Sequence, residues 1–449
     1  MTAETIFFPL DPGAAALLTR LHAAGHAAYA VGGCVRDSLL GQTPHDWDLC
    51  TSATPEQVLE LFGEAHCIPT GLQHGTVTVK HGGELYEITT FRTEGAYSDG
   101  RHPDHVVFVP DVKEDLARRD FTINAMAYNA EEGLIDPFGG QNDLAVGIVR
   151  AVGEPQRRFE EDALRILRLY RFAARFRFAI DPATGQAARA LCRHLDCVSE
   201  ERIAEELSRL LAAPAPGAYL EAEVLAVIFP ELDAAELPES RRILDALEPG
   251  MEHVPVRLAA LLCPLGEAGA RAALRRLKCS NALTGMVGTL VGESRELLPQ
   301  TRIGPFHCPP HCLRQQGPTH RTVFGRTSDS PLEETRIQTK RLLGKYGLYM
   351  VEQLDALCGA IAPDRVVEFA VQAELARQLE ADGACCRINQ LAVNGRDLMD
   401  AGIRPGPGLR RVLDALLEQV LTGQLPNEKA ALLAAAAQVV RLDKRTDVR

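Results

Sequence analysis

One stretch near the N-terminus constrains the fold of this chain more than any other. An apolar, strand-like run at residues 27–31 is followed by Gly32-Gly33 and then by residues 35–40, which can open a helix. A Gly-Gly pair lets the backbone pass close to a ligand, and the first-turn N–H groups of a helix point at an anion. The stretch therefore predicts a strand, a glycine turn and a helix around a phosphate, with Arg36 beside it.

An acidic pair follows a turn-prone Gly-Gln-Thr-Pro run at residues 41–44. If residues 47–51 form a strand, the side chains of Asp46 and Asp48 leave the same face and can share one divalent cation. An Asp-x-Asp pair alone is more often a solvated turn, but its place directly after the glycine turn favours a metal site. We therefore predict a magnesium site here.

Strand patterns continue beyond this pair. Residues 76–79 and 85–91 are rich in β-forming residues and flank the turn His81-Gly82-Gly83, which predicts a hairpin. Glu87 falls in the second strand and can complete an acidic triad with the two aspartates. The alternative is a solvent-facing glutamate, which is the usual state of this residue on a strand.

Two further segments precede the end of the β-rich part. Residues 92–103 contain Gly, Ser, Asp and Arg without periodicity, which predicts a mobile loop at the mouth of the site. Phe121, Asn124 and Ala125 then recur at helical spacing, so Arg118 and Arg119 are expected near a helix start. The alternative is a solvated basic patch. A turn at residues 135–140 closes this part of the chain.

From residue 160 onward the pattern is mostly helical. An apolar stripe is expected on one side of the first helix, with arginines on the other side and Asp162 next to Arg165 at the boundary. The alternative for Asp162 and Arg165 is a purely structural salt bridge within one helix, on a solvated face. The stripe consists of Ala163, Ile166, Leu167, Tyr170, Ala173 and Ala174, and the arginines are Arg168, Arg171 and Arg175.

Charge and length limit the possible functions. The net charge of −12 argues against a uniformly nucleic-acid-binding surface, yet residues 150–177 hold eight arginines against four acidic residues, which suits contact with RNA phosphates. A chain of 449 residues is too long to fold around one hydrophobic core, so we expect more than one domain. The start lacks the basic residues of a signal peptide and no apolar run has membrane-spanning length, so we expect a cytoplasmic protein without membrane contact. No pattern points to a protein partner.

The twelve cysteines lack the regular spacing of a disulfide scaffold, so most should be buried thiols. One irregular segment, residues 301–331, contains Cys308 and Cys312 together with His307, His311 and His320. These are possible zinc ligands, although no second cysteine pair follows at finger-like spacing. The alternative is a proline-rich surface loop.

Four motifs in this order resemble the class II tRNA nucleotidyltransferases, the CCA-adding enzymes, whose head and neck are similar to those of bacterial poly(A) polymerases. They are Gly-Gly-Cys-Val-Arg-Asp at 32–37, Asp-Trp-Asp at 46–48, Arg-Arg-Asp-Phe-Thr-Ile-Asn-Ala at 118–125 and Glu-Asp-Ala-Leu-Arg-Ile-Leu-Arg at 161–168. Weaker similarity reappears at 391–398 and 427–429. Each motif alone is weak evidence, but the ordered set is specific.

The resemblance implies an α+β fold. A nucleotidyltransferase head with a mixed sheet, residues 1–140, would precede an all-helical neck at 141–212, which binds the nucleotide base and RNA. A helical body at 213–330 and a tRNA-binding helical tail at 331–449 would follow.

The resemblance also implies a function: addition of C, C and A without a template to the 3′ end of tRNA, from CTP and ATP, with release of pyrophosphate. Asp46 and Asp48 would hold Mg²⁺, with Glu87 as a further catalytic carboxylate. Gly33, Arg36 and Arg119 would contact the triphosphate or its surroundings, and Asp162, Arg165, Arg168 and Arg171 would line the nucleotide pocket.

An Asp/Arg pair offers a physical basis for choosing bases. An ionised aspartate only accepts hydrogen bonds and an arginine only donates them. Asp162 and Arg165 therefore match the Watson–Crick edges of cytosine and adenine in one orientation, and oppose those of uracil and guanine.

Several alternatives share these motifs. A bacterial poly(A) polymerase usually carries a strongly basic C-terminal extension, and this chain ends with mixed charges. A CC-adding enzyme resembles the family with the 92–103 loop shortened, whereas an A-adding enzyme is not distinguished. A catalytically silent RNA-binding protein would have lost the metal carboxylates. His102 replaces a frequent arginine, and residues 257–266 lack the His-Asp mark of a phosphohydrolase domain, so no such activity is expected.

Overall fold

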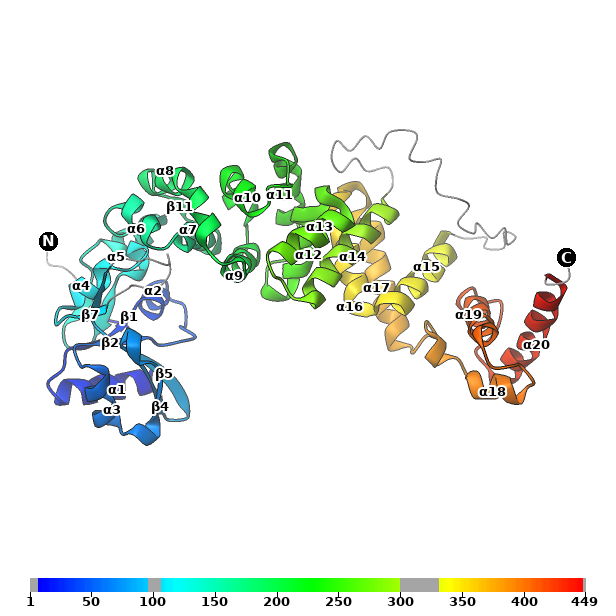
Figure 1. The fold of residues 1–449 in the computed structure, drawn as a ribbon, viewed down its shortest axis with the longest axis horizontal. Helices are drawn as coiled ribbons and strands as arrows, with labels where there is room; N and C mark the ends of the chain where they lie inside the picture. The colour runs from blue at the N-terminus through cyan, green and yellow to red at the C-terminus, as the bar shows by residue number, and fades with distance from the viewer. Residues whose placement is uncertain (1–6, 96–105, 299–330, 447–449) are drawn as a thin grey trace. The chain divides into compact units, whose positions relative to one another are not determined.

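The computed structural model describes residues 7–95, 106–298 and 331–446 (Figure 1). The chain divides into two compact units, Met1–Val254 with Ala272–Ser280, and Pro255–Arg271 with Asn281–Arg449. The division into head, neck, body and tail is finer than these units and remains a prediction. His102 and the five possible zinc ligands between 307 and 320 lie outside the described residues.

The first unit contains a seven-stranded mixed sheet, as predicted. Strands β2 and β5 run parallel and the other neighbouring pairs run antiparallel. In spatial order the strands are β3 (Cys67–Gly71), β4 (Thr76–His81), β5 (Glu84–Thr90), β2 (Leu49–Thr51), β1 (Ala28–Val31), β8 (Ala127–Asn129) and β9 (Gly133–Ile135).

The predicted local elements around the glycine motif and the hairpin are confirmed. Strand β1 leads through Gly32 into helix α2 (Gly33–Leu39). Strands β4 and β5 form the hairpin, with Thr78 opposite Glu87. Its two-residue loop is Gly82-Gly83, whose φ angles of 63° and 94° suit a primed turn that glycine adopts without strain.

Two expectations were wrong. Arg92–Glu94 is not loop but strand β6, which pairs with β7 (Val106–Phe108); residues 96–105 lie outside the described chain. Helix α4 (Val112–Ala117) ends before Arg118, so the two arginines follow a helix end rather than a helix start. Thr122–Asn124 forms only a 3₁₀ turn. The spacing misled because this turn is buried on every side, which an amphipathic surface helix is not.

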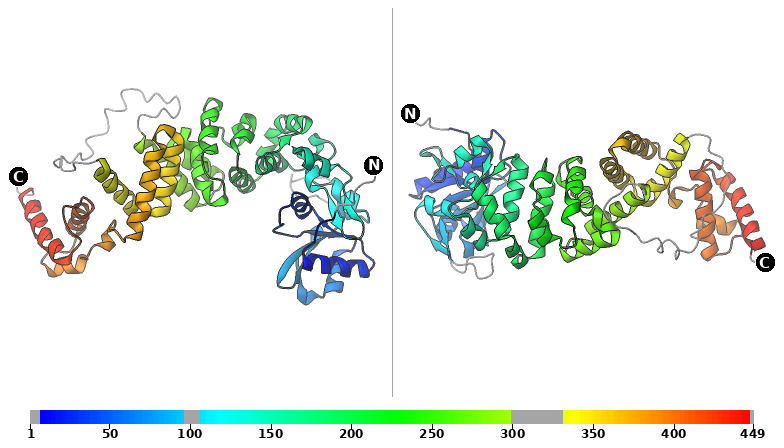
Figure 2. Two further views of the ribbon diagram at one scale, coloured as in Figure 1. Left: turned by 180° about the vertical axis from the view of Figure 1, so that it is seen from behind. Right: turned by 90° about the horizontal axis from the view of Figure 1, so that it is seen from above.

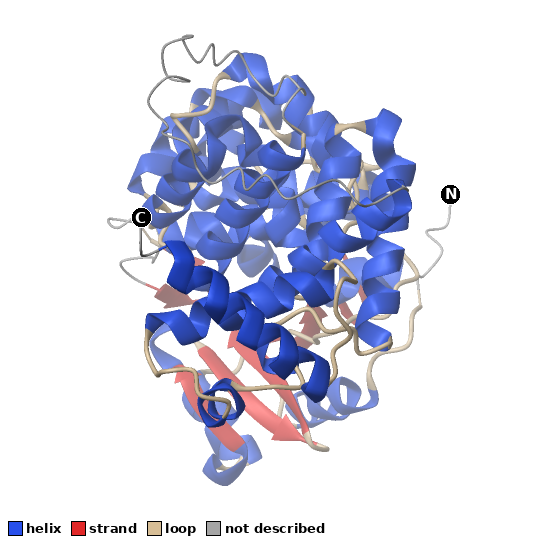
Figure 3. Ribbon diagram, turned by 90° about the vertical axis from the view of Figure 1, so that its right-hand side faces the viewer, coloured by secondary structure: helices blue, strands red, loops and turns tan. Residues whose placement is uncertain are grey.

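Helices complete both units, and all strands of the described residues lie before Asp181 (Figures 2 and 3). No described helix is long and apolar enough to span a bilayer. The short strands β10 (Ile148–Val149) and β11 (Ala179–Ile180) pair in parallel. The other helices of the first unit are α1 (Pro12–Ala23), α3 (Pro55–Phe62), α5 (Gly140–Val146), α6 (Pro155–Glu161), α7 (Leu164–Phe176), α8 (Pro182–Ala190), α9 (Glu200–Leu211), α10 (Ala222–Ile228) and α11 (Leu237–Asp245).

The second unit is helical throughout its described residues. The boundaries between the units fall within two helices. All but the first residue of α12 (Val254–Leu262) belongs to the second unit, and α13 (Gly266–Arg276) passes from the second unit to the first after Arg271. The remaining helices are α14 (Asn281–Leu297), α15 (Pro331–Tyr346), α16 (Leu348–Ile361), α17 (Val366–Ala381), α18 (Gly395–Asp400), α19 (Pro407–Leu421) and α20 (Lys429–Thr446). All ten described cysteines are free thiols and most are buried, as predicted.

Helix α7 has the predicted amphipathic character. All six residues of the apolar stripe are buried, and the arginines lie on the other side. Helix α6 ends at Glu161, and its C-cap residue, Asp162, accepts a hydrogen bond at 3.0 Å from the N–H of Leu164, the first residue of α7. The helical pattern is therefore interrupted where the Asp/Arg motif lies.

A buried carboxylate joins the head to α7. One oxygen of Asp120 accepts hydrogen bonds from Arg168 Nε and Nη2, at 2.9 and 2.6 Å, and the other accepts from Asn124 Nδ2 at 3.1 Å. Asn124 in turn accepts from Arg36 on α2, and the Arg36 guanidinium lies over the Phe172 ring, 5.4 Å from its centroid. The network fixes α2, the 3₁₀ turn and α7 to one another.

The ion pair between Asp120 and Arg168 should make the free energy of unfolding depend on pH. Arg168 and Asn124 outweigh the effect of burial and lower the pKa of Asp120 to about 2. The resulting stabilisation is present above the ordinary pKa of 3.8 and is lost as the pH falls through about 2. Asp120→Asn should lower the free energy of unfolding by about 2–4 kcal/mol at pH 7, and by much less at pH 2. Urea unfolding at both pH values measures this; exposed Asp196→Asn is the control. An equal deficit at both pH values would contradict the pairing.

Helix α15 offers a test of packing in the second unit. A Cβ on Gly344 would lie 2.1 Å from the backbone oxygen of Cys386, whereas a Cβ on helical Gly408 meets nothing within 4 Å. Gly344→Ala should therefore destabilise the unit by about 1–3 kcal/mol, and Gly408→Ala should be neutral or slightly stabilising. Thermal unfolding of both variants decides this. Wild-type stability of Gly344→Ala would show that the two segments do not approach so closely.

Candidate active site

The acidic pair lies at the entry of strand β2. The strand begins at Leu49 rather than at residue 47 as expected, and both Asp46 and Asp48 are exposed. The backbone oxygen of Asp48 still accepts a hydrogen bond from the Val31 N–H at 3.0 Å, which fixes its position beside the end of β1. The segment with the two aspartates therefore lies next to the glycine turn at residues 32 and 33, as the sequence predicted.

Glu87 lies close to this pair. Leu49 pairs with Ile88 in the parallel β2–β5 ladder, so the preceding residues, Asp48 and Glu87, stand side by side on the face opposite those buried side chains. Partial desolvation raises the pKa of Asp48, Arg119 opposes the rise, and Glu87 and Asp46 add to it. Burial is thus the main cause of the raised pKa, and the two neighbouring carboxylates contribute less. Within the described residues, however, no three acidic, His or Cys side chains converge into a ready metal cluster.

A cationic side chain covers the glycine turn. Gly32 has a φ of 79°, and a Cβ at this position would lie 2.7 Å from Arg119 Nη1. Arg119 Nη2 lies 3.5 Å from Asp115, whereas the buried Nε has no hydrogen-bond partner among the described residues. Gly33 has ordinary helical geometry and opens α2. The positive φ at position 32 therefore favours glycine, and the arginine that lies over it is close enough to Asp48 to lower the pKa of that carboxyl.

Arg36 lies beneath this surface. Its donors are taken by Asp37, at 2.7 Å, and by Asn124, and burial lowers the pKa of its guanidinium. Its side chain is only 4% exposed. Arg36 therefore belongs to the surroundings of the glycine turn and holds α2 in place.

Asp162 and Arg165 do not form the intrahelical salt bridge considered from their spacing. Arg165 Nη1 pairs with Glu161 at 2.8 Å, whereas Asp162 pairs with Arg202 of α9 at 2.9 Å. Asp162 itself lies at the break between α6 and α7, and its extended backbone, with φ −144° and ψ 104°, takes its side chain away from the helical spacing. Arg165 also donates to the backbone oxygens of residues 118 and 158. Both side chains are therefore held by other groups.

The two remaining arginines of the motif are also paired. Arg168 binds Asp120, and Arg171 lies 2.7 Å from Glu206 of α9. Burial lowers the pKa of Arg171 to about 10, although Glu206 opposes this. Arg175 lies 3.4 Å from Asp37. The side chain of Arg171 is only 12% exposed, whereas that of Arg175 remains 42% exposed. Contact of this helix face with RNA phosphates stays a prediction.

Sequence reasoning missed the residues that orient this site. Asp120 and Asn124 belong to the motif at residues 118–125, but the sequence did not predict their roles, because their partners Arg168 and Arg36 are far away in the sequence. Glu161 precedes Arg165 by four residues, a spacing that could have indicated the pair. The partners on α9, Arg202 and Glu206, carry no local signal that links them to α7.

The arrangement suits chemistry on a nucleotide. Asp46, Asp48 and Glu87 lie near one another, and Arg119 lies over the glycine turn beside them. At the start of α7, Asp162 and Arg165 keep unused hydrogen-bonding capacity. Three of the five N–H groups of Arg165 are used by described residues, and each Asp162 oxygen accepts one bond. Both side chains can therefore take one more polar partner.

Family models match three parts of the chain. A model described as the poly A polymerase head domain matches residues 28–150, one for an RNA and SrmB binding site of polymerase A matches 177–236, and tRNA nucleotidyltransferase domain 2 matches 333–436. The first of these covers the sheet, the acidic pair and Arg119.

Curated relatives match this chain over nearly its full length. The CCA-adding enzyme of Limosilactobacillus fermentum is 34% identical, over 98% of this chain and 100% of that protein. That of Lactobacillus delbrueckii subsp. bulgaricus is 37% identical, over 93% and 95%.

Solved structures have the same fold. The Bacillus stearothermophilus CCA-adding enzyme in complex with CTP superposes with a TM-score of 0.72 at 30% identity, covering 97% of this chain and 100% of that one. The Thermotoga maritima enzyme complexed with tRNA, at 20% identity and a TM-score of 0.63 over 96% of each chain, shows the fold alone. This chain belongs to the family of the CCA-adding enzymes, which are tRNA nucleotidyltransferases.

Proposed function

We propose that this enzyme adds C, C and A to the 3′ end of tRNA from CTP and ATP and releases pyrophosphate. The observation that carries the proposal is the position of Arg119, which lies over Gly32 and close enough to Asp48 to affect its pKa. A triphosphate bound at the glycine turn would then lie beside the carboxylates. Because CTP, ATP and tRNA are needed together, we expect the enzyme to act in the cytoplasm.

The acidic face suits Mg²⁺. Asp46, Asp48 and Glu87 supply the oxygen donors that this ion prefers, and Mg²⁺ commonly takes one or two carboxylates together with substrate phosphates. Asp46 and Asp48 would hold it, and when bound it would acidify the attacking hydroxyl and neutralise charge on the leaving pyrophosphate. Three exposed carboxylates so close together repel one another, which is the reason to expect a cation there. The role of Glu87 as a third carboxylate belongs to the same proposal.

The protein's own groups position the reactants. The terminal 3′ hydroxyl of tRNA attacks the α-phosphate in line, the bond to the β-phosphate breaks, and no covalent enzyme intermediate is required. Arg119 would stabilise the triphosphate, with Gly32-Gly33 allowing its close approach. The buried Arg36 and the partly buried Arg168 would keep the glycine turn and α7 in fixed relation.

Asp162 and Arg165 would select the base. Their unused hydrogen-bonding capacity matches cytosine and adenine, whose amino groups donate and whose neighbouring ring nitrogens accept. Uracil and guanine present the opposite order, so polar groups would remain unpaired. Ion pairs with Glu161 and Arg202 would fix the side chains of Arg165 and Asp162, respectively.

Nucleotide incorporation tests the function directly. Transcripts of tRNA that end before CCA, after C and after CC should receive C, C and A respectively, with CTP used in the first two steps and ATP in the last. Asp46→Ala and Asp48→Ala should abolish incorporation while tRNA still binds, because the metal is lost and the surrounding surface is intact. Exposed Glu131→Ala is a matched control.

The pattern of products separates the alternatives. Addition only to the transcript that ends in CC would identify an A-adding enzyme, and long adenosine tails would identify a poly(A) polymerase. Full activity of Asp46→Ala with Mg²⁺ would contradict the metal assignment. Tight tRNA binding without any incorporation by the wild type would indicate a silent RNA-binding protein.

Base selection makes a separate prediction. Asp162→Asn keeps an oxygen for the Leu164 N–H but places an amide donor where U and G present carbonyls. It should raise kcat/KM for UTP and GTP relative to CTP by roughly tenfold to hundredfold, equivalent to about 1.5–3 kcal/mol. Arg165→Ala should instead weaken CTP and ATP together. Steady-state kinetics with all four nucleotides measure both effects. Unchanged discrimination in Asp162→Asn would leave Asp162 with only its structural contacts.

A further inference from the structure

A pocket that is open to solvent lies beside the acidic segment of the first unit. Its volume is about 680 Å³, and residues 8–11, 38, 41–47 and 84–86 line it. Small-molecule sites in proteins commonly have this size and combine apolar or aromatic walls with a few polar groups. The roles proposed above use only Asp46 among the lining residues, so the pocket itself has no function assigned to it.

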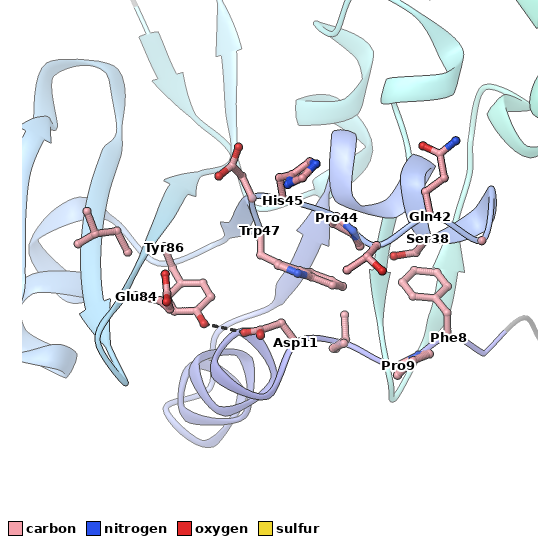
Figure 4. Close-up of a pocket in the computed structure, with 15 residues that line it drawn as sticks. Phe8, Pro9, Asp11, Ser38, Gln42, Pro44, His45, Trp47, Glu84 and Tyr86 are labelled. Carbon is pink, nitrogen blue, oxygen red and sulfur yellow. Dashed lines mark hydrogen bonds between the residues drawn. The ribbon is translucent and has the colours of Figure 1, made fainter. Parts of the chain in front are cut away.

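Three aromatic side chains, those of Phe8, Trp47 and Tyr86, line the pocket (Figure 4). Phe8 and Trp47 are partly exposed, and Leu85, which also lines the pocket, is 58% exposed. Tyr86 is buried, and its hydroxyl donates a hydrogen bond to Asp11 at 2.6 Å. Exposed aromatic side chains are the surfaces on which proteins stack unpaired nucleic-acid bases. The pocket therefore offers room and aromatic surface for a flat ring.

The charge of the lining indicates which part of a nucleotide fits. Among the described residues that line the pocket there is no lysine or arginine, whereas Asp11, Asp46 and Glu84 are acidic. Such a lining repels phosphate groups, which proteins usually bind with basic side chains. A base carries no charge, and the exposed side chains of Gln42, Thr43 and Glu84 can form hydrogen bonds with its polar edge. The lining therefore suits a base better than a triphosphate or an RNA backbone.

Asp46 belongs both to this pocket and to the proposed metal site. The hydroxyl that attacks the α-phosphate has to reach the metal, so the RNA strand that carries this hydroxyl ends next to the pocket. The base of the incoming nucleotide is assigned to Asp162 and Arg165, neither of which lines the pocket. The bases at the 3′ end of the tRNA are unpaired and covalently tied to the attacking hydroxyl. They are therefore the bases that can reach this pocket.

We propose that the pocket holds one of the unpaired bases at the 3′ end of the acceptor tRNA, stacked on the indole of Trp47. The proposal rests on the proposed function, because tRNA is the acceptor in that reaction, and it adds a subsite for the acceptor strand. Stacking on an aromatic ring tolerates any base, since every base has a π face. One pocket can thus serve tRNA that ends before CCA, after C and after CC.

Trp47 is the only tryptophan of the chain, so tryptophan fluorescence reports on this pocket. A tRNA transcript that ends in CC is titrated into the full-length wild-type protein without nucleotides, and it should quench the emission because a base stacks on the indole. Transcripts that are abasic at one of the last three positions are the matched controls, since their charge is unchanged. At one position the abasic transcript should quench much less and bind roughly fivefold to a hundredfold more weakly. CTP alone should not quench.

Steady-state kinetics of position 47 variants give a second readout. Trp47→Ala should raise KM for tRNA by a similar factor and leave KM for CTP unchanged, because the triphosphate and its base bind outside the pocket. Trp47→Phe should keep most of the affinity for tRNA, since an aromatic ring is still present. Phe7→Ala is the control, because Phe7 is 69% exposed and does not line the pocket. An equal rise of KM for tRNA and for CTP in Trp47→Ala would contradict the proposal.

The outcomes separate the pocket from the activity. Equal quenching and equal affinity for all abasic transcripts would overturn the proposal, and so would quenching by CTP alone. Both results come from the wild-type protein, so they do not depend on whether a variant folds. If the protein adds C, C and A but no abasic position matters, the proposed function stands and the pocket fails. If one position matters but no nucleotide is added, the pocket stands as an RNA site and the proposed activity fails.

Discussion

The buried carboxylate of Asp120 is the constraint on which the site depends. It follows the end of α4, where the backbone turns into the core, and it receives hydrogen bonds from Arg168 of α7 and from Asn124. A carboxylate buried in this way requires such partners, because an unpaired charge in the protein interior is costly. Helix α7, which follows the proposed base-selecting Asp162 and contains Arg165, is thereby held to the sheet with the acidic pair.

The same interaction shapes the neighbouring groups. Asn124 can accept from Arg36 because its amide nitrogen is directed to Asp120, and Arg36 in turn fixes α2 beneath the glycine turn. Phe172 packs against three guanidinium groups, those of Arg36, Arg168 and Arg171. Of the arginines predicted to form a positive surface, Arg165 and Arg171 are mostly buried, whereas Arg157 and Arg175 remain exposed. The negative charge of Asp46, Asp48 and Glu87 remains open to solvent, as a site for a cation and a triphosphate requires.

Local patterns predicted local structure well. The strand before Gly32, the hairpin around Gly82-Gly83 and the apolar stripe of α7 follow from periodicity and turn chemistry, which depend on neighbouring residues alone. The turn at Thr122–Asn124 was predicted as a helix because its burial on every side comes from distant elements. The strand at Arg92–Glu94 was missed because residues 92–103 have no strand-like periodicity and its partner, β7, begins only at Val106.

The candidate site was predictable in the same measure. Its acidic pair and its arginines stand in short motifs, so their residue types could be named from the sequence. Their partners could not, since the contacts of Asp162 with Arg202 and of Arg165 with Glu161 depend on how α6, α7 and α9 meet. The interval of three residues between Asp162 and Arg165 suggested a direct pair, and the break between the two helices removes it.

The most direct test of this account is a crystal structure with Mn²⁺ and a non-hydrolysable CTP analogue, with the metal located by its anomalous scattering. The account predicts an anomalous peak between Asp46 and Asp48, the triphosphate beneath Arg119 at Gly32, and the cytosine edge bonded to Asp162 and Arg165. A peak away from both aspartates, or a cytosine ring that contacts neither residue of α7 and its cap, would contradict it.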